Sequence, residues 1–233
     1  MLTSFIYRTF ISLSMIEALI FDCDGVLVDS MHLHTKAWKM AFEEAGIGLN
    51  EKEIYWMEGA NDNGIIEMVL KNAEIASSSD IFRSVPGRKH ELFNVDEVRS
   101  FDGINEYLKE LKDKLKLAVV SGSDRDALEK MTGKFFPDIF DVMVSGNDVS
   151  RGKPQPDPYN KAVDELGVCR ENCIVVENAP LGVEAAKAAG LFCIGLPTYV
   201  DKNDLKHADV VLRDHAELIE YLRKIQTTET IIC

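Results

Sequence analysis

The sequence predicts an α/β fold: a doubly wound (Rossmann-like) parallel sheet with an inserted all-helical cap domain. Six short apolar runs have strand-like patterns, helical patterns separate most of them, and one long helical stretch interrupts the alternation after the first run. Strands that alternate with helices are joined by right-handed crossovers and form an open parallel sheet covered on both faces. The 233 residues, 46% of them hydrophobic, suffice for one large domain that carries a smaller one.

The predicted strands are short and apolar. The first, over residues 16–21, stops at two aspartates and a glycine, as a buried parallel strand does where it ends in a polar loop. The later strands are expected at 115–120, 142–144, 173–176, 193–196 and 210–212. We therefore assign residues 15–29 and 101–225 to an α/β catalytic core.

Residues 30–100 break this alternation and are expected to be wholly helical. The apolar residues between 38 and 45 share one helix face, a second amphipathic helix covers 65–73, and Pro86-Gly87 marks a turn before a further helical segment. A crossover needs little more than a dozen residues, so a helical stretch of this length predicts a separate cap domain inserted into the core.

Composition and charge exclude several classes of protein. The formal net charge of −13 disfavours a nucleic-acid or membrane-surface partner. Residues 1–14, treated as an N-terminal extension, lack the clear features of a signal peptide, and no run reaches the length of a membrane span. The five cysteines show no zinc-type spacing and predict a reduced chain. We expect a cytoplasmic protein.

Polar residues follow the predicted strands, and in an open α/β sheet ligands bind beyond the carboxyl ends of the strands. The residues in question are, in chain order, Asp22, Asp24, Ser121, Gly122, Lys153, Glu177 and Asn178. They would bring carboxylates, a hydroxyl group and an ammonium group to one site.

Two aspartates two positions apart at a strand end suit phosphoryl chemistry. Asp22 and Asp24 can bind Mg²⁺, which prefers oxygen ligands. One carboxylate can form an acyl-phosphate, and the other can protonate the leaving oxygen and later activate water. A turn with two solvated carboxylates would show the same motif, so this motif does not decide alone.

The second and third strand ends offer groups for a phosphate. Backbone N–H groups at a helix opening, with the Ser121 hydroxyl, can bind phosphate oxygens. Ser123 and Asp126 resemble a capping box, which is also the simpler explanation of this segment. Lys153 would offset the negative charges around a phosphate, although most lysines are solvated.

The combination is more specific than its parts. FDCDGVLVDS, VVSGS, GKPQPDP and VVENAPLGVEAAKAAG occur in this order, each at a predicted strand end. This resembles the haloacid-dehalogenase-like (HAD) hydrolase superfamily, in the helical-cap branch that includes β-phosphoglucomutase and phosphoglycolate phosphatase. The resemblance implies that Asp22 is the nucleophile and Asp24 the general acid/base. It also implies that Ser121, Gly122 and Lys153 hold the phosphoryl group.

The resemblance further implies a Mg²⁺ cofactor bound by Asp22, the backbone carbonyl of Asp24, and the pair Glu177-Asn178. Members of the family usually have Glu-Asp at that pair, and the asparagine brings no charge. We therefore expect weaker metal binding rather than none. A non-catalytic module that binds a phosphorylated ligand stays an alternative.

Two residues of the cap segment are candidates for substrate contacts. His34 shares a helix face with Trp38 and is interpreted first as a packing or interface histidine. In the family a histidine at this place lies near the cap hinge, so His34 is a secondary candidate. Gly59 lies in the loop where β-phosphoglucomutases carry basic residues that grip a second phosphate.

The loop around Gly59 points to the reaction type. Residues 58–63 contain Glu58 and Asp62 but no lysine or arginine, and these acids would repel a second phosphate. We therefore expect a Mg-dependent phosphatase acting on a small sugar or polyol phosphate through an aspartyl-phosphate. A β-phosphoglucomutase-type mutase is the alternative. A 2-haloacid dehalogenase is disfavoured because it needs neither Mg²⁺ nor Asp24. The expected partner is a small phosphorylated metabolite, and monomer and dimer stay equally open.

Overall fold

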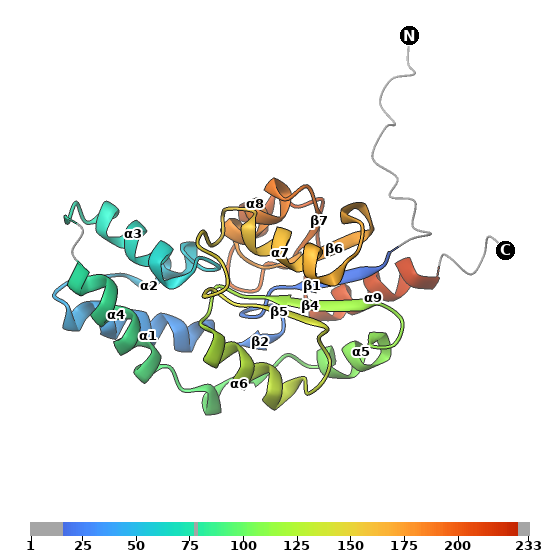
Figure 1. Cartoon of the computed structure of the whole chain (residues 1–233), viewed down its shortest axis with the longest axis horizontal. Coiled ribbons are helices and arrows are strands. Elements are labelled where there is room, and N and C mark those ends of the chain that lie inside the picture. The colour runs from blue at the N-terminus through green and yellow to red at the C-terminus, as the bar shows by residue number, and fades with distance from the viewer. Residues whose placement is uncertain (1–15, 77–78, 228–233) are drawn as a thin grey trace, which may run out of the picture.

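The computed structural model describes residues 16–76 and 79–227, and the predicted extension over residues 1–14 lies outside these ranges. Six parallel strands form one sheet in the order β5-β4-β1-β6-β7-β8 (Figure 1). The strands are β1 (Ala18–Phe21), β4 (Lys116–Val120), β5 (Val142–Val144), β6 (Cys173–Glu177), β7 (Phe192–Gly195) and β8 (Val210–Val211). Each lies within two residues of its predicted bounds.

β1 occupies a central position between β4 and β6. Phe21 at its end pairs with Val119 of β4 and with Val176 of β6. The three strands are therefore in register at their carboxyl ends. As a result, the polar residues that follow them are brought to the same edge of the sheet.

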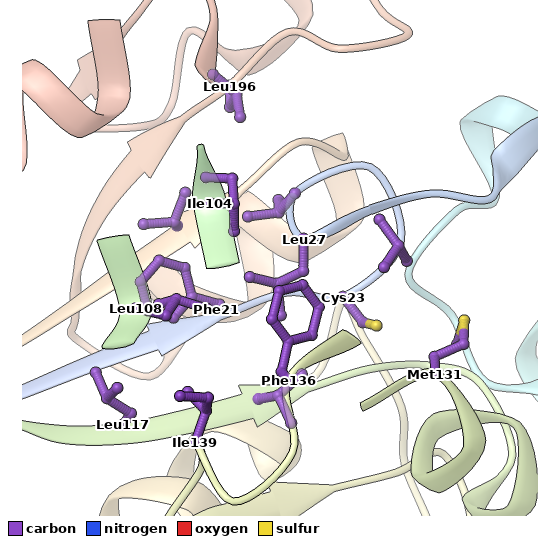
Figure 2. Close-up of a cluster of buried hydrophobic side chains, with 14 of the residues drawn as sticks. Phe21, Cys23, Leu27, Ile104, Leu108, Leu117, Met131, Phe136, Ile139 and Leu196 are labelled. Carbon is purple, nitrogen blue, oxygen red and sulfur yellow. The ribbon is translucent and has the colours of Figure 1, made fainter. Parts of the chain in front are cut away.

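Both faces of the sheet are buried. Leu19 and Phe21 of β1 pack with the helices on one face, whereas Ala18 and Ile20 pack with those on the other. The first face is covered by α5 (Ile104–Leu111), α6 (Arg125–Phe135) and α9 (His215–Thr227), and the second by α7 (Asp157–Leu166) and α8 (Pro180–Ala188). Figure 2 shows Phe21 among the side chains of the first face. The predicted doubly wound α/β fold is confirmed.

The helical segment lies to one side of the sheet (Figure 1). It consists of α1 (Met31–Glu44), α2 (Glu51–Trp56), α3 (Asp62–Asn72) and α4 (Ser79–Leu92). These helices share an apolar cluster of their own, built around Trp38, Phe42, Ile66 and Leu70. We propose on this basis that residues 30–100 form the cap and that 15–29 and 101–225 form the core.

The end of the helical stretch differs from the prediction. Arg99–Ser100 form a short strand, β3, which pairs antiparallel with β2 (Val28–Asp29). The two points where the chain passes between core and helices thus lie side by side. Strands of two residues are too short to show an alternating pattern, so this pair could not be predicted from the sequence.

The turn predicted at Pro86-Gly87 is wrong, because α4 runs through both residues. A proline inside a helix removes one backbone hydrogen bond and crowds the preceding turn. Val85 and Lys89, on either side of the pair, are both buried, and α4 packs along α1. Burial of this helix face offsets the cost of the proline.

Within the described residues, 3₁₀ turns lie at Val95–Glu97, Arg170–Asn172 and Lys202–Leu205. Among the residues with described structure, no helix is both long and apolar enough to cross a bilayer.

Candidate active site

Asp22 is the first residue after β1 and is buried beside a lysine. The Nζ of Lys153 lies 2.5 Å from Asp22 Oδ1 and 2.6 Å from Glu177 Oε1. All three side chains are buried. Burial raises the pKa of Asp22 well above its usual value, although Lys153 opposes this. Burial also acts to lower the pKa of Lys153, but the two carboxylates outweigh it and raise that pKa, so the ammonium group stays charged.

Asp24 has both carboxylate oxygens engaged. Ser30 Oγ donates to Oδ1 at 2.6 Å, and His34 Nε2 lies 2.9 Å from the same oxygen. Ser121 and Ser123 donate their hydroxyls to Oδ2 at 3.0 and 3.1 Å. Burial acts to raise the pKa of Asp24, but the charge of His34 and these hydrogen bonds outweigh it and lower the pKa. Asp24 is therefore ionised in this arrangement.

His34 has two kinds of contact. Its ring stacks on Phe93 with the centroids 4.0 Å apart, which is the packing role expected from the sequence. It also contacts Asp24, which the sequence did not indicate. Burial lowers the pKa of His34, although Asp24 opposes this. His34 is thus a packing residue that is also in contact with the aspartate pair.

The predicted capping box of Ser123 and Asp126 is wrong. The N-cap of α6 is Asp124, whose side chain accepts the Ala127 N–H at 3.0 Å. The Ser123 hydroxyl instead donates to the buried carboxylate of Asp24. A hydrogen bond to an ionised carboxylate is stronger than the hydrogen bond that a neutral serine makes as an N-cap. Ser123 therefore binds Asp24 and does not cap α6. The backbone N–H of Ser123 donates to Ser121 Oγ.

The loop that contains Gly59 packs closely against the loop that contains Gly122, next to the Lys153 side chain. A Cβ on Gly122 would lie 2.5 Å from the carbonyl oxygen of Ala60 and 2.6 Å from that of Gly59. Gly59 itself has φ +88°, and a Cβ there would lie 3.2 Å from Lys153 Cδ. The close approach of backbone explains the glycine at position 122, and the positive φ explains the glycine at position 59.

The Gly122→Ala substitution is expected to destabilise the protein by about 1–3 kcal/mol, because its methyl group would overlap the backbone of residues 59–60. Urea unfolding measures this free energy. Gly133→Ala is a matched control, since Gly133 lies inside α6 with nothing within 4 Å of the new Cβ. It is expected to stabilise α6 by about 0.5–1 kcal/mol. Equal stabilities of the two variants would contradict the close approach.

Glu177 is satisfied by groups of the protein. Its Oε1 accepts from Lys153 and, at 2.6 Å, from the Tyr159 hydroxyl. Its Oε2 accepts the backbone N–H groups of Asn178 and Ala179 at 2.9 and 3.2 Å. Both oxygens of this predicted metal ligand are therefore engaged.

Asn178 and Glu58 form a buried pair between core and cap. The Asn178 Nδ2 donates to Glu58 Oε1 at 2.8 Å. Asn178 Oδ1 and Glu58 Oε2 are buried and have no hydrogen-bond partner among the described residues. Burial raises the pKa of Glu58 well above its usual value, although the Asn178 bond opposes this. Sequence reasoning placed Glu58 near a substrate phosphate and missed its contact with Asn178.

A cavity lies between the aspartates and the helical segment. It is lined by Asp22, Asp24, Met31, His34, Trp38, Ile54, Glu58, Gly59, Ala60, Asp62, Ile65, Lys89, Gly122 and Ser123. The set joins the carboxyl ends of β1 and β4 to all four helices described in the cap segment and to the loop before α3. It includes both predicted catalytic aspartates, both predicted cap residues and Gly122, whereas Ser121 and Lys153 are not in the lining.

Lys89 in this lining was missed by the sequence analysis. It is buried, with its Nζ 5.3 Å from the centroid of the Trp38 ring and 3.9 Å from Asp62 Oδ1. The spacing of Val85, Lys89 and Phe93 by four would have placed it on a buried helix face. The predicted break at Pro86-Gly87 concealed that spacing.

The donor set is chemically suited to a hard cation such as Mg²⁺. Asn178 Oδ1 and Glu58 Oε2 are buried oxygens without partners, and Asp22 and Asp24 follow β1 at the same edge of the sheet. Mg²⁺ takes oxygen ligands of this kind. No group of three or more His, Cys, Asp and Glu side chains within the described ranges is already arranged to hold a metal.

The arrangement is that of an α/β enzyme whose active-site residues follow the strands of a doubly wound sheet. A family model described as haloacid dehalogenase-like hydrolase matches residues 19–196. The chain belongs to the haloacid dehalogenase-like hydrolase family, as its motifs predicted. The expectation that it is an enzyme of the phosphohydrolase type is confirmed.

Named relatives and a solved structure agree with this assignment. The chain is 32% identical over 212 residues to validoxylamine A 7'-phosphate phosphatase of Streptomyces hygroscopicus. The aligned region covers 88% of this chain and 96% of the relative. It is 34% identical over 178 residues to the phosphorylated carbohydrates phosphatase of Thermotoga maritima, covering 75% and 82%. A putative β-phosphoglucomutase from Bacteroides vulgatus superposes with a TM-score of 0.83 at 31% identity, covering 92% and 90%.

Proposed function

We propose that this protein is a Mg-dependent phosphatase that hydrolyses a small sugar or polyol phosphate through an aspartyl-phosphate intermediate. The observation that carries the proposal is the position of Asp22, a buried carboxylate directly after β1 and in contact with Lys153. Two relatives, named validoxylamine A 7'-phosphate phosphatase and phosphorylated carbohydrates phosphatase, support a small phosphate ester as the substrate class. We also propose a cytoplasmic location.

In the first step the Asp22 carboxylate attacks phosphorus. The bond between Asp22 and phosphorus forms as the ester bond to the leaving oxygen breaks, and that oxygen takes a proton from Asp24. Lys153, in contact with Asp22, lies where it can stabilise the negative charge that moves onto the phosphoryl oxygens. The Ser121 hydroxyl and the backbone N–H groups of the Gly122 loop would orient those oxygens.

The hydrogen bonds of Asp24 suggest how it obtains the proton. Burial acts to raise the pKa of Asp24, but His34 and the hydroxyls of Ser30 and Ser121 outweigh it and favour the ionised form. A bound phosphoryl group would draw the Ser121 hydroxyl away and add negative charge nearby. Both effects raise the pKa of Asp24, so it takes up a proton as the substrate binds.

In the second step Asp24 acts as the base. It takes a proton from water, the water oxygen bonds to phosphorus, and the bond to Asp22 breaks to release inorganic phosphate. The residues proposed to hold Mg²⁺ are Asp22, the backbone carbonyl of Asp24, and the pair Glu177-Asn178. When bound, the ion neutralises charge between the nucleophile and the phosphoryl group.

Phosphate release from a panel of phosphorylated sugars and polyols, with Mg²⁺ and with a chelator, tests this function. We expect turnover that the chelator abolishes. Thermal stabilisation by phosphorylated ligands without any turnover would instead establish the non-catalytic binding module.

Asp24→Asn is expected to slow poor leaving groups most, because a general acid contributes least when the departing oxygen is already stable as an anion. The ratio of kcat/KM for an aryl phosphate to that for a sugar phosphate should rise at least about tenfold. Equal losses on both substrates would contradict the acid/base role. Asp126→Asn, a nearby acid on α6, serves as the control.

Mutase activity is a second candidate function, because Lys89 places a positive charge in the cavity. The sequence argument against a mutase rested on the lack of a cation in residues 58–63, whereas Lys89 brings one to the cavity from α4. Asp62 lies 3.9 Å away and partly balances this charge, which supports the phosphatase. With Mg²⁺, β-glucose 1-phosphate and glucose 1,6-bisphosphate, glucose 6-phosphate formed much faster than free phosphate would establish the mutase.

A further inference from the structure

Asn178 is neutral, and the pair Glu177-Asn178 at the end of β6 therefore provides a single negative charge, that of Glu177. This charge is already in contact with Lys153, and both Glu177 oxygens accept hydrogen bonds from the protein. Asn178 thus offers an oxygen to a cation but no charge. A further carboxylate at this edge of the sheet would strengthen the binding of a divalent cation.

Glu58 brings such a carboxylate from the other side of the cavity. It lies between α2 and α3, is 5% exposed, and lines the cavity with Asp22 and Asp24. Its Oε1 accepts from Asn178 Nδ2 at 2.8 Å. A carboxylate cannot donate, so this contact requires the Asn178 NH₂ group to face Glu58 and leaves Asn178 Oδ1 for another partner.

Neither remaining oxygen of the pair has that partner. Glu58 Oε2 and Asn178 Oδ1 are buried and lack a hydrogen bond among the described residues. The charged groups that act on Glu58 are the carboxylates of Asp22, Asp24 and Glu177, and no ion pair to Glu58 is formed within the described ranges. The ionised form of a carboxylate buried among others is costly, and a cation bound beside it would remove that cost.

We propose that Glu58 is a ligand of the Mg²⁺ site, reaching it from the cap segment and supplying the negative charge that Asn178 lacks. This inference rests on the proposed Mg-dependent function. A loop of the cap segment would thus take part in metal binding. Glu58 and Asn178 would each provide an oxygen ligand, and Glu58 would also provide the negative charge.

The test measures Mg²⁺ binding without substrate, by calorimetry and by the Mg²⁺ dependence of the melting temperature. It compares the parent with Glu58→Gln, Asn178→Asp and the double variant. Glu58→Gln should raise the Kd for Mg²⁺ at least tenfold, because the charge is lost. The double variant should return to within about threefold of the parent, since the carboxylate has only moved to residue 178.

Glu43→Gln is the matched control. Glu43 is an exposed acid of α1, so this variant changes the net charge equally and should leave the Kd unchanged. With a chelator present, Glu58→Gln should melt no lower than the parent, because it removes a buried carboxylate that forms no ion pair among the described residues.

The outcomes separate the two levels of the proposal. A parent that binds no Mg²⁺ would overturn both the metal requirement of the proposed function and the role of Glu58. A parent that binds Mg²⁺, with a Kd for Glu58→Gln equal to that of the control, would overturn the role of Glu58 alone. Failure of Asn178→Asp to restore binding in the double variant would also overturn it, because Glu58 would then act only by holding Asn178.

Discussion

Asp22→Asn is expected to lower the turnover of a sugar phosphate on the order of 10⁴-fold or more, because an amide cannot form the covalent intermediate. The fold should persist. Asparagine has almost the same shape, and Lys153 keeps its contact with Glu177. Burial raises the pKa of Asp22, so the charged form is costly in the folded state, and the melting temperature of the variant should equal or exceed that of the parent.

Single-turnover kinetics and the melting temperature check this expectation together. Asp29→Asn is a suitable control, because Asp29 belongs to β2 and accepts a hydrogen bond from the Tyr199 hydroxyl, whereas Asp22 contacts Lys153. Turnover of Asp22→Asn within about tenfold of the parent, a change of ~1.4 kcal/mol in the barrier, would exclude Asp22 as the nucleophile.

Lys153→Met is expected to destabilise the protein by about 3–5 kcal/mol, because it leaves two buried carboxylates without their shared cation. The free energy of unfolding in urea measures this loss. Lys161→Met removes a lysine from a surface pair with Glu165 and should cost less than about 1 kcal/mol.

The stability lost in Lys153→Met should grow with pH. The pKa of Asp22 is already above its usual value and rises further when the ammonium group is removed. A carboxyl group with a raised pKa does not destabilise the folded protein at a pH below its pKa in the unfolded chain. Above that pH it lowers the free energy of unfolding increasingly, until the pH reaches its pKa in the folded protein. The loss should therefore be smaller at pH 5 than at pH 8. Asp22→Asn added to Lys153→Met should recover part of the stability, whereas a pH-independent loss would show that packing is responsible.

The core could be predicted from the sequence because its information is local. Each strand is a short apolar run, and each ends at a polar residue whose place follows from the register of a parallel sheet. Asp22, Ser121 and Lys153 were predicted in this way, and the fold brings them to one edge of the sheet. Gly122 was found with them, since it lies between two serines at a strand end.

The partners of these residues could not be predicted, because they depend on how the cap segment meets the core. Lys89 reaches the cavity only because α4 continues through Pro86-Gly87. The contact of Glu58 with Asn178 joins residues 120 positions apart, and no spacing rule connects them. From the sequence, the Ser123 side chain was expected to cap a helix. Only the folded structure brings the Asp24 carboxylate within hydrogen-bond distance of its hydroxyl.

The pairing of β2 with β3 has a consequence for how such proteins diversify. Because Val28–Asp29 and Arg99–Ser100 are hydrogen-bonded neighbours, the chain leaves the sheet and returns to it at almost the same point. A segment whose two ends meet can be replaced by another of different length without stretching the sheet, as insertions with adjacent ends are generally tolerated. We therefore expect residues 30–98 to be exchangeable with the corresponding segment of a relative, so that substrate preference is transferred while the core keeps its chemistry.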